Sequence, residues 1–225
     1  MTIDTILFDW DGTLIDTAQQ AFEAFQKALL DLGISLDPAT YERIYSPNWY
    51  SMYEKLGLAK EKWKEADGLW IRHYANQLPQ LLPGTKEALQ DLASGGYSLG
   101  IVTSGSRDRV LSEIESLGLT HVFRIVVCSD DVVNRKPHPE GLQIAIEKLQ
   151  KRPEDCCYVG DCPEDIEMGH RAGVMTIGIQ SQYPASRKLP ESKPDLVFSS
   201  LDQLVQKLSS WDRRRLAGSF SPTKT

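Results

Sequence analysis

The stretch ILFDWDGTLID, residues 6–16, places two carboxylates directly after a short apolar run near the start of the chain. Residues 3–8 are predicted to form a buried strand. Side chains two residues apart on a strand point the same way, so Asp9 and Asp11 can face one spot where the strand ends. Two neighbouring carboxylates repel each other unless a cation or a shared proton is present. Mg²⁺ prefers a few carboxylates together with substrate oxygens, so the stretch predicts a metal-assisted reaction with a carboxylate as nucleophile.

Predicted helices and strands alternate from Gly84 onward. The strands are expected at residues 98–103, 125–128, 156–160, 174–179 and 196–198, and the helices at 85–94, 107–117, 139–150, 163–172 and 201–208. This alternation is typical of a parallel sheet covered by helices on both faces. The strand at 3–8 must join that sheet, because an isolated strand has no partner. We therefore predict a doubly wound α/β core formed by residues 1–16 and 83–208.

The segment between these two parts of the core, residues 17–82, has helical spacing and no convincing strand. Asp16 or Thr17 is expected to cap its first helix, and Asp37 with Pro38 is expected to begin the second. The segment is thus predicted to be a helical cap domain inserted after the first strand. Residues 209–225 are predicted to be a flexible C-terminal tail.

Composition narrows the classes of partner. The 225 residues carry a net charge of −6, which argues against a broad nucleic-acid-binding surface. The four cysteines form no CxxC pair and no disulfide framework, as expected of reduced thiols in the cytoplasm. The sequence has neither a signal-peptide pattern nor an apolar run long enough to span a bilayer. We expect a cytoplasmic monomer or homodimer without membrane or nucleic-acid partners.

Side chains suited to phosphoryl chemistry follow the predicted strands. In an open parallel sheet, ligands bind at the edge formed by the carboxyl ends of the strands, where these side chains would converge. Carboxylates can attack or bind a metal, hydroxyl and backbone N–H groups can hold phosphate oxygens, and a lysine can neutralise charge. The residues expected at this edge are Asp9, Asp11, Thr103, Ser104, Lys136, Asp161 and Asp165.

Four motifs in this order resemble the phosphatase branch of the haloacid dehalogenase superfamily: DWDGT at 9–13, VTS at 102–104, Lys136–Pro137, and GDCPED at 160–165. The resemblance implies a doubly wound core with a helical cap inserted after the first motif. It also implies Mg²⁺-dependent hydrolysis of a small phosphomonoester through an aspartyl-phosphate intermediate, as in phosphoglycolate phosphatases. The expected partner is therefore a small phosphorylated metabolite.

The resemblance implies a separate role for each acid. Asp9 would be the nucleophile and a metal ligand. Asp11 would protonate the leaving alcohol and then activate water, and its backbone carbonyl would bind Mg²⁺. Asp161 would coordinate the metal, and Asp165 would either do so directly or orient the other ligands.

The remaining roles concern the phosphate. Lys136 would neutralise charge between Asp9 and the phosphoryl group. Thr103 and Ser104 would hold phosphoryl oxygens, together with the backbone N–H of Trp10. The aromatic side chains in residues 41–53 are interpreted mainly as packing, although a cap that faces the site could use some of them as substrate walls.

Several neighbouring functions remain as alternatives. Asp11 disfavours the dehalogenase and phosphonatase branches, which lack this second acid, and Ala21 stands where β-phosphoglucomutases have a histidine. An inorganic pyrophosphatase and a sugar-phosphate phosphatase or phosphomutase of the same superfamily stay open. The non-enzyme alternative is a switch of the phospho-aspartate receiver type, which the long helical insertion disfavours.

Overall fold

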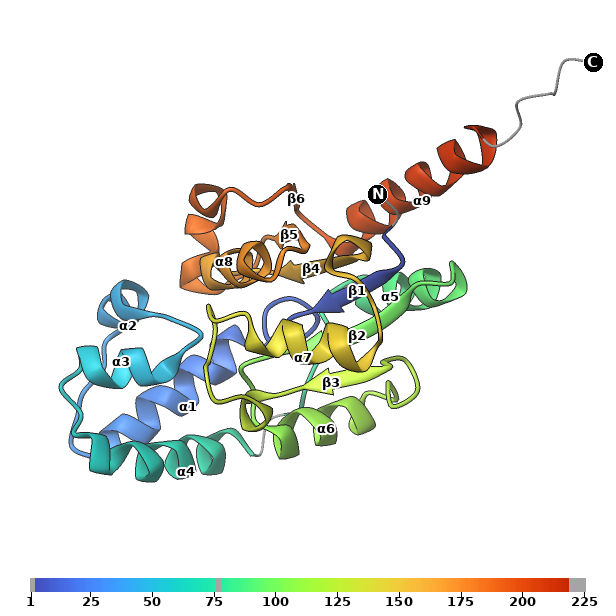
Figure 1. Ribbon diagram of the computed structural model, residues 1–225. Helices are drawn as coiled ribbons and strands as arrows, with labels where there is room; N and C mark the ends of the chain where they lie inside the picture. Colours follow the sequence, from blue (N-terminus) through green and yellow to red (C-terminus); the bar gives the residue numbers. More distant parts are fainter. Residues whose placement is uncertain (1–2, 76–77, 219–225) are drawn as a thin grey trace, which may run out of the picture.

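The parallel sheet predicted from the sequence is present, and the first strand lies inside it (Figure 1). The computed structural model describes residues 3–75 and 78–218. Within these residues, six parallel strands are ordered β3-β2-β1-β4-β5-β6. Their bounds are β1 Thr5–Phe8, β2 Ser98–Val102, β3 Ile125–Val127, β4 Cys156–Gly160, β5 Met175–Ile179 and β6 Leu196–Phe198.

The two faces of the sheet are covered by different helices. Alternate side chains of β1 divide between them: Ile6 and Phe8 pack with apolar residues of α5, α6 and α9, whereas Leu7 packs with those of α7 and α8. The bounds of these helices are α5 Thr85–Ser94, α6 Arg107–Ser116, α7 Glu140–Lys148, α8 Pro163–Ala172 and α9 Leu201–Gly218. The fold is therefore the doubly wound α/β class, as predicted.

A second group of helices is inserted between β1 and α5 and packs around its own apolar core. Phe25 and Leu29 of α1 meet Tyr41 of α2, Tyr53 of α3 and Ala66 of α4 there. These helices are α1 Ala18–Asp31, α2 Pro38–Ile44, α3 Trp49–Lys55 and α4 Trp63–Tyr74. We call them the cap; they lie to the left of the sheet in Figure 1. The exact division at residues 17 and 83 stays a prediction.

Short 3₁₀ turns complete the described chain. They are η1 Lys60–Lys62, η2 Ser129–Asp131, η3 Pro153–Asp155 and η4 Pro184–Ser192. The last part of the cap begins as the 3₁₀ turn η1 and continues as α4 to Tyr74, while residues 76–77 lie outside the described residues. No helix in the described part of the chain has the length and apolarity needed to cross a membrane.

The last helix of the core is longer than predicted. Helix α9 does not end near residue 208 but continues to Gly218, so residues 209–218 are helical. No proline or glycine interrupts SSWDRRRLA before Gly218, so this stretch contains no strong helix breaker. The rest of the predicted tail, residues 219–225, lies outside the described residues.

The helix caps and cysteines test smaller predictions. Asp37 caps α2, because its side chain accepts a hydrogen bond from the backbone N–H of Thr40 at 2.9 Å. Thr17 occupies the N-cap of α1, but neither it nor Asp16 supplies a side-chain cap, since the Thr17 hydroxyl is bonded elsewhere. All four cysteines belong to the described residues and are free thiols, as predicted.

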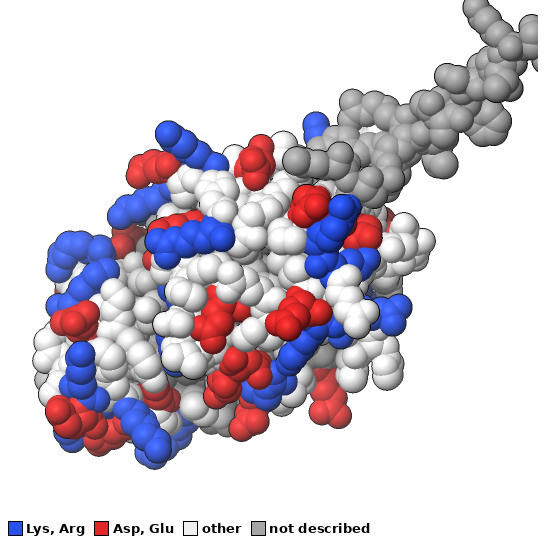
Figure 2. Space-filling view, in the orientation of Figure 1, with Lys and Arg blue, Asp and Glu red and all other residues white. Residues whose placement is uncertain are grey.

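Acidic and basic side chains are interspersed over the face of the molecule that Figure 2 shows.

Candidate active site

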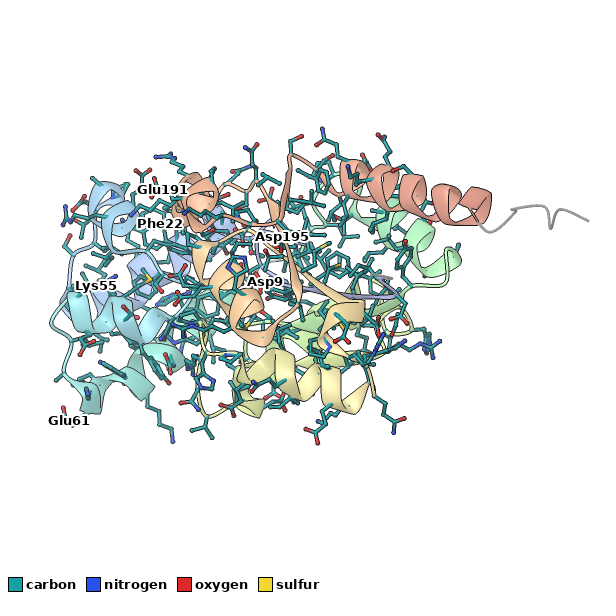
Figure 3. All side chains as sticks on the ribbon, turned by 45° about the horizontal axis from the view of Figure 1, so that its top comes forward. Asp9, Phe22, Lys55, Glu61, Glu191 and Asp195 are labelled. Carbon is teal, nitrogen blue, oxygen red and sulfur yellow. The ribbon has the colours of Figure 1, made fainter. Side chains whose placement is uncertain are left out.

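Asp9 and Lys136 form the centre of the site at the end of β1. Lys136 is buried and donates from Nζ to Asp9 Oδ1 at 2.6 Å, to Asp165 Oδ1 at 2.8 Å and to the Tyr158 hydroxyl at 2.7 Å. Burial raises the pKa of Asp9 to about 7, against the lowering effect of Lys136, and the negative charge of Asp165 adds to the rise. Figure 3 shows Asp9 inside the molecule, whereas Glu61 lies at the outer end of the cap.

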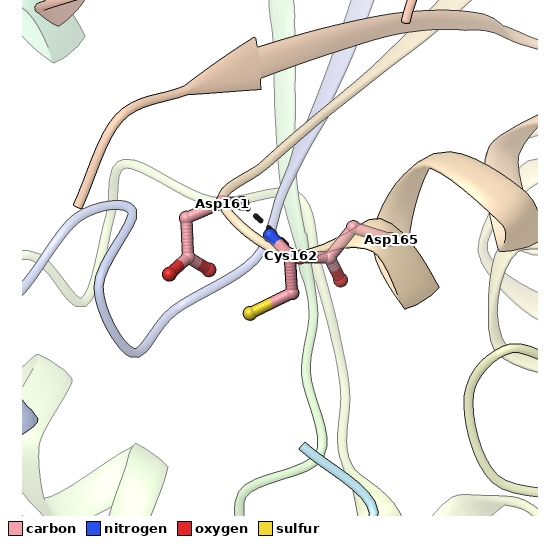
Figure 4. A group of neighbouring side chains, drawn as sticks. All are labelled: Asp161, Cys162 and Asp165. Carbon is pink, nitrogen blue, oxygen red and sulfur yellow. Dashed lines mark hydrogen bonds between the residues drawn. The ribbon is translucent and has the colours of Figure 1, made fainter. Parts of the chain in front are cut away.

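Asp161, Cys162 and Asp165 follow β4 and surround the start of α8 (Figure 4). Their potential ligand atoms all lie within 4.8 Å of one another. Asp165 uses one oxygen for Lys136 and the other to accept the backbone N–H groups of Asp161 at 3.1 Å and Cys162 at 3.0 Å. Asp165 therefore has both oxygens engaged in fixing the lysine and the loop.

Asp161 is the acid of this group that has free acceptor capacity. Its Oδ2 accepts a hydrogen bond from Ser181, and its Oδ1 makes no hydrogen bond with a described residue. Burial, followed by the charges of Asp165 and Asp9, holds the pKa of Asp161 well above its usual range. Burial also raises the pKa of the Cys162 thiol, and a neutral thiol is a poor ligand for a hard cation.

Asp11 lies in an ion-pair network that we did not predict. Arg109 of α6 binds it in bidentate fashion, at 2.5 Å to Oδ2 and 3.0 Å to Oδ1, and the Thr17 hydroxyl donates to Oδ1 at 2.9 Å. Arg109 also pairs with Glu113 at 3.1 Å, which in turn accepts the indole N–H of Trp10 at 2.7 Å. The Trp10 ring is thus a buried structural element, so any contact of this residue with phosphate falls to its backbone.

Arg109 also connects the core to the cap. Its guanidinium lies 5.7 Å from the ring centroid of Trp70 and 5.3 Å from that of Tyr74, both on α4. The one sequence signal for this network is the four-residue spacing between Arg109 and Glu113 on a predicted helix.

Thr103 and Ser104 lie where β2 ends. Thr103 is buried, and its hydroxyl accepts the backbone N–H of Gly105 at 3.0 Å. Both residues line the same cavity as Asp9, Asp11 and Asp161. The structure therefore brings the predicted hydroxyl groups and these acids together, while Lys136 and Asp165 lie directly behind Asp9.

Gly12 permits close packing beside these acids. Its backbone has φ of +79°, and a Cβ there would lie 2.6 Å from the ring of Tyr183 and 2.7 Å from Asp161 Oδ2. Tyr183 reaches in from the loop after β5, and its hydroxyl lies 3.0 Å from that of Thr17. Any larger residue at position 12 would displace Tyr183 or Asp161.

A cavity of about 280 Å³ extends from the acids into the cap. Its far walls are aromatic and come mainly from α2, α3 and α4: Tyr41, Tyr45, Trp49, Tyr50, Tyr53 and Trp70. Tyr41 and Tyr53 are buried in the cap core as well, which agrees with the packing interpretation. All five aromatics of residues 41–53 nevertheless face the cavity, so packing alone does not describe them.

Comparison with known proteins agrees with this arrangement. The family model described as haloacid dehalogenase-like hydrolase matches residues 6–179. The chain belongs to this family. It is also 32% identical over 219 residues to the pyrophosphatase PpaX of Bacillus cereus strain B4264, a match that covers 95% of this chain and all of that protein. The family membership makes the protein an enzyme of the phosphatase type.

Solved structures of haloacid dehalogenase-like hydrolases have the same fold. One from Bacteroides fragilis has a TM-score of 0.82 and 26% identity, and covers 90% of this chain and 100% of that one. A predicted phosphoglycolate phosphatase from Haemophilus somnus has a TM-score of 0.79 at 22% identity, covering 92% of this chain and 98% of that one. The latter likeness concerns the fold alone.

Proposed function

We propose that the protein hydrolyses a small phosphomonoester with Mg²⁺, through an aspartyl-phosphate formed on Asp9. The observation that carries the proposal is the position of the Asp9 carboxylate. It lies at the end of β1, contacts the Lys136 ammonium at 2.6 Å, and lines a cavity together with Thr103 and Asp161. This is the arrangement that an in-line attack on a bound phosphoryl group requires.

In the first step, a carboxylate oxygen of Asp9 attacks phosphorus while the bond from phosphorus to the leaving oxygen breaks. Asp11 gives its proton to that oxygen, so the product leaves as an alcohol. Lys136 offsets negative charge near the phosphoryl oxygens, and Thr103 can donate its hydroxyl proton to one of them. Because Asp11 is held by Arg109, we infer that substrate binding must release it from this pair before the step.

In the second step, Asp11 accepts a proton from water, and the water oxygen attacks phosphorus. The bond between Asp9 and phosphorus breaks, which releases orthophosphate and restores the carboxylate. The release of Asp11 from Arg109 serves this step as well, because a carboxylate that accepts from Arg109 and Thr17 is a weaker base.

The acids fit a Mg²⁺ ion. Asp9 and Asp161 are buried, and the charge of Asp9 is one of the causes that raise the pKa of Asp161. A divalent cation would relieve this repulsion, with Asp9, Asp161 and the backbone carbonyl of Asp11 as ligands. Asp165 would not bind the metal itself but would hold Lys136 and the loop that carries Asp161 in position. When bound, the metal would neutralise the phosphate and polarise its bond to the leaving group.

Inorganic pyrophosphate is the second candidate substrate. A relative at 32% identity is named a pyrophosphatase, and the same two steps would cleave pyrophosphate with phosphate as the leaving group. The aromatic cap walls favour an organic leaving group. A sugar-phosphate phosphatase would use the same residues, whereas no histidine stands at position 21 for a mutase.

The free thiols agree with our placement of the enzyme in the cytoplasm.

The test is hydrolysis of p-nitrophenyl phosphate by the purified protein with Mg²⁺ or with EDTA. We expect continuous release of p-nitrophenol with Mg²⁺ and a loss of more than about 100-fold on chelation. Release of one equivalent per protein without further turnover would contradict the proposal and favour the receiver-type switch.

A further inference from the structure

Arg135 differs from the other cations near the cavity because its charge is not matched. Lys136 contacts Asp9 and Asp165, and Arg109 contacts Asp11 and Glu113. Arg135 lines the same cavity but forms no ion pair with any acid in residues 3–75 and 78–210. Its Nη1 is buried and has no hydrogen-bond partner there.

Two rings of the cap hold the Arg135 guanidinium in place. Its central carbon lies 4.7 Å from the ring centroid of Trp49 and 4.4 Å from that of Tyr50. The two rings lie at 81° to each other and so contact the guanidinium from two directions, while the N–H groups of Nη1 stay available to an acceptor. The cap therefore restricts the motion of Arg135 while Nη1 remains without an acceptor.

The cap acid that lines the cavity, Asp67, already accepts hydrogen bonds from other donors. Asp67 accepts hydrogen bonds from the Trp49 indole at 2.9 Å, from the Tyr50 hydroxyl at 2.8 Å and from the Tyr53 hydroxyl at 3.1 Å. These bonds fix Trp49 and Tyr50, the same two rings that lie against Arg135. Asp67 thus acts on the orientation of the guanidinium through the aromatic residues.

The position of Arg135 relative to Asp9 indicates which part of a substrate it would meet. Its chain neighbour Lys136 reaches the nucleophile, whereas the Arg135 side chain extends to Trp49 and Tyr50 on the cap side of the cavity. A phosphoryl group at Asp9 would place its leaving group toward the cap. A buried cationic donor without an acceptor is unfavourable, and a carboxylate or phosphate matches its paired N–H groups.

We infer that Arg135 binds a second anionic group, carried by the leaving group of the substrate. This inference rests on the proposed function and narrows its substrate class to phosphate esters or anhydrides with two anionic ends. The second group is a carboxylate in a phosphorylated hydroxy acid and a phosphate in pyrophosphate. Both present oxygens in the geometry that a guanidinium recognises.

The experiment compares kcat/KM for 2-phosphoglycolate, pyrophosphate and ethyl phosphate. Ethyl phosphate matches 2-phosphoglycolate in size but has a methyl group in place of the carboxylate. The wild type is expected to prefer one of the two doubly anionic substrates to ethyl phosphate, and the preferred one identifies the second group. In Arg135→Met, this preference should fall by about 10- to 100-fold, the value of a hydrogen bond to a charged group.

Two further variants separate charge from structure. Arg135→Lys keeps the charge without the planar fork and should retain part of the preference. Arg72→Met removes an exposed cation of α4 and should leave the preference unchanged. Circular dichroism checks folding, and if Arg135→Met does not fold, the preference of Arg135→Lys decides.

The outcomes distinguish this inference from the proposed function. If the wild type hydrolyses p-nitrophenyl phosphate but prefers neither doubly anionic substrate, or if Arg135→Met and Arg135→Lys keep the preference, the inference is wrong and the proposed function stands. A wild type that releases no phosphate from any of these compounds with Mg²⁺ contradicts the proposed function, and the inference falls with it.

Discussion

The sheet edge and the cap build the two ends of one cavity in different ways. At the sheet edge, two ion-pair networks hold the acids: Lys136 joins Asp9 to Asp165, and Arg109 joins Asp11 to Glu113. In the cap, aromatic rings form the walls, and Asp67 ties three of them together. The difference teaches that a change at the edge should affect every substrate, whereas a change in the cap should affect the choice among them.

The largest effect is expected from Asp9→Asn. An amide cannot form the acyl-phosphate, so turnover should fall by at least about 10⁴-fold for every phosphate ester. Asp16→Asn is the matched control, because this half-buried acid lies seven residues on and makes no side-chain hydrogen bond with a described residue. Steady-state assays on several substrates measure the turnover of both variants. If the loss in Asp9→Asn depended on the substrate, the proposed difference between the sheet edge and the cap would be wrong.

Lys136→Met should be the most destabilising change at the edge. It leaves Asp9 and Asp165 buried without their cation, which costs about 4 kcal/mol in the free energy of unfolding. The loss should shrink as the pH falls through the raised pKa of Asp9, near 7, because a protonated carboxyl needs no cation. Urea denaturation at pH 6 and pH 8 measures it. Lys151→Met, which removes an exposed pair with Asp4, should cost less than about 1 kcal/mol.

Arg109→Met tests the connection between edge and cap. Removing the guanidinium leaves Asp11 and Glu113 unpaired and ends the contacts with Trp70 and Tyr74, so we expect a loss of about 3 kcal/mol. Arg107→Met, on the same helix, breaks a more exposed pair with Asp131 and should cost less than about 1 kcal/mol. Equal losses in the free energy of unfolding would show that the network around Asp11 stabilises the protein no more than an exposed ion pair does.

Apart from the control variants, Tyr53→Phe should have the smallest effect. It removes one hydrogen bond to Asp67 at 3.1 Å from a buried ring, which is worth about 1 kcal/mol. Tyr50→Phe should cost less, because Tyr50 is only half-buried and water can replace its hydroxyl. Thermal unfolding gives both values. A loss of stability in Tyr53→Phe as large as that in Lys136→Met would show that polar contacts in the cap stabilise the protein as much as those at the sheet edge.

The fold could be predicted because local patterns determine it. The apolar run before Asp9, the strand–helix alternation after Gly84 and Asp37 before Pro38 each concern residues that are neighbours in the chain. The parallel sheet then brings strand ends to one edge, so Asp9, Thr103 and Asp161 could be placed together from their positions alone. The exception was α9, where helical propensity continued beyond the last amphipathic turn.

The residues that we missed act across long separations in the chain. Arg109 reaches Asp11, 98 positions earlier, and Ser181 reaches Asp161 from the loop after β5. Arg135 follows no motif in the sequence, and only the contacts with Trp49 and Tyr50 of the cap distinguish it from other arginines. Such pairs depend on how the cap and the loops meet the sheet, and no local period or spacing reports that arrangement.

The central position of β1 has a consequence for the order of events during synthesis. Thr5 pairs with Ser98 on one side and with Cys156 on the other, so the strand that ends before Asp9 cannot pair with both neighbours until most of the chain has left the ribosome. Until then, the cap can form from local contacts while Ile6, Leu7 and Phe8 remain unpaired and apolar. Asp9 is therefore among the last residues of the candidate site to acquire its surroundings, because a chain that ends before β4 lacks one of the two strands beside β1.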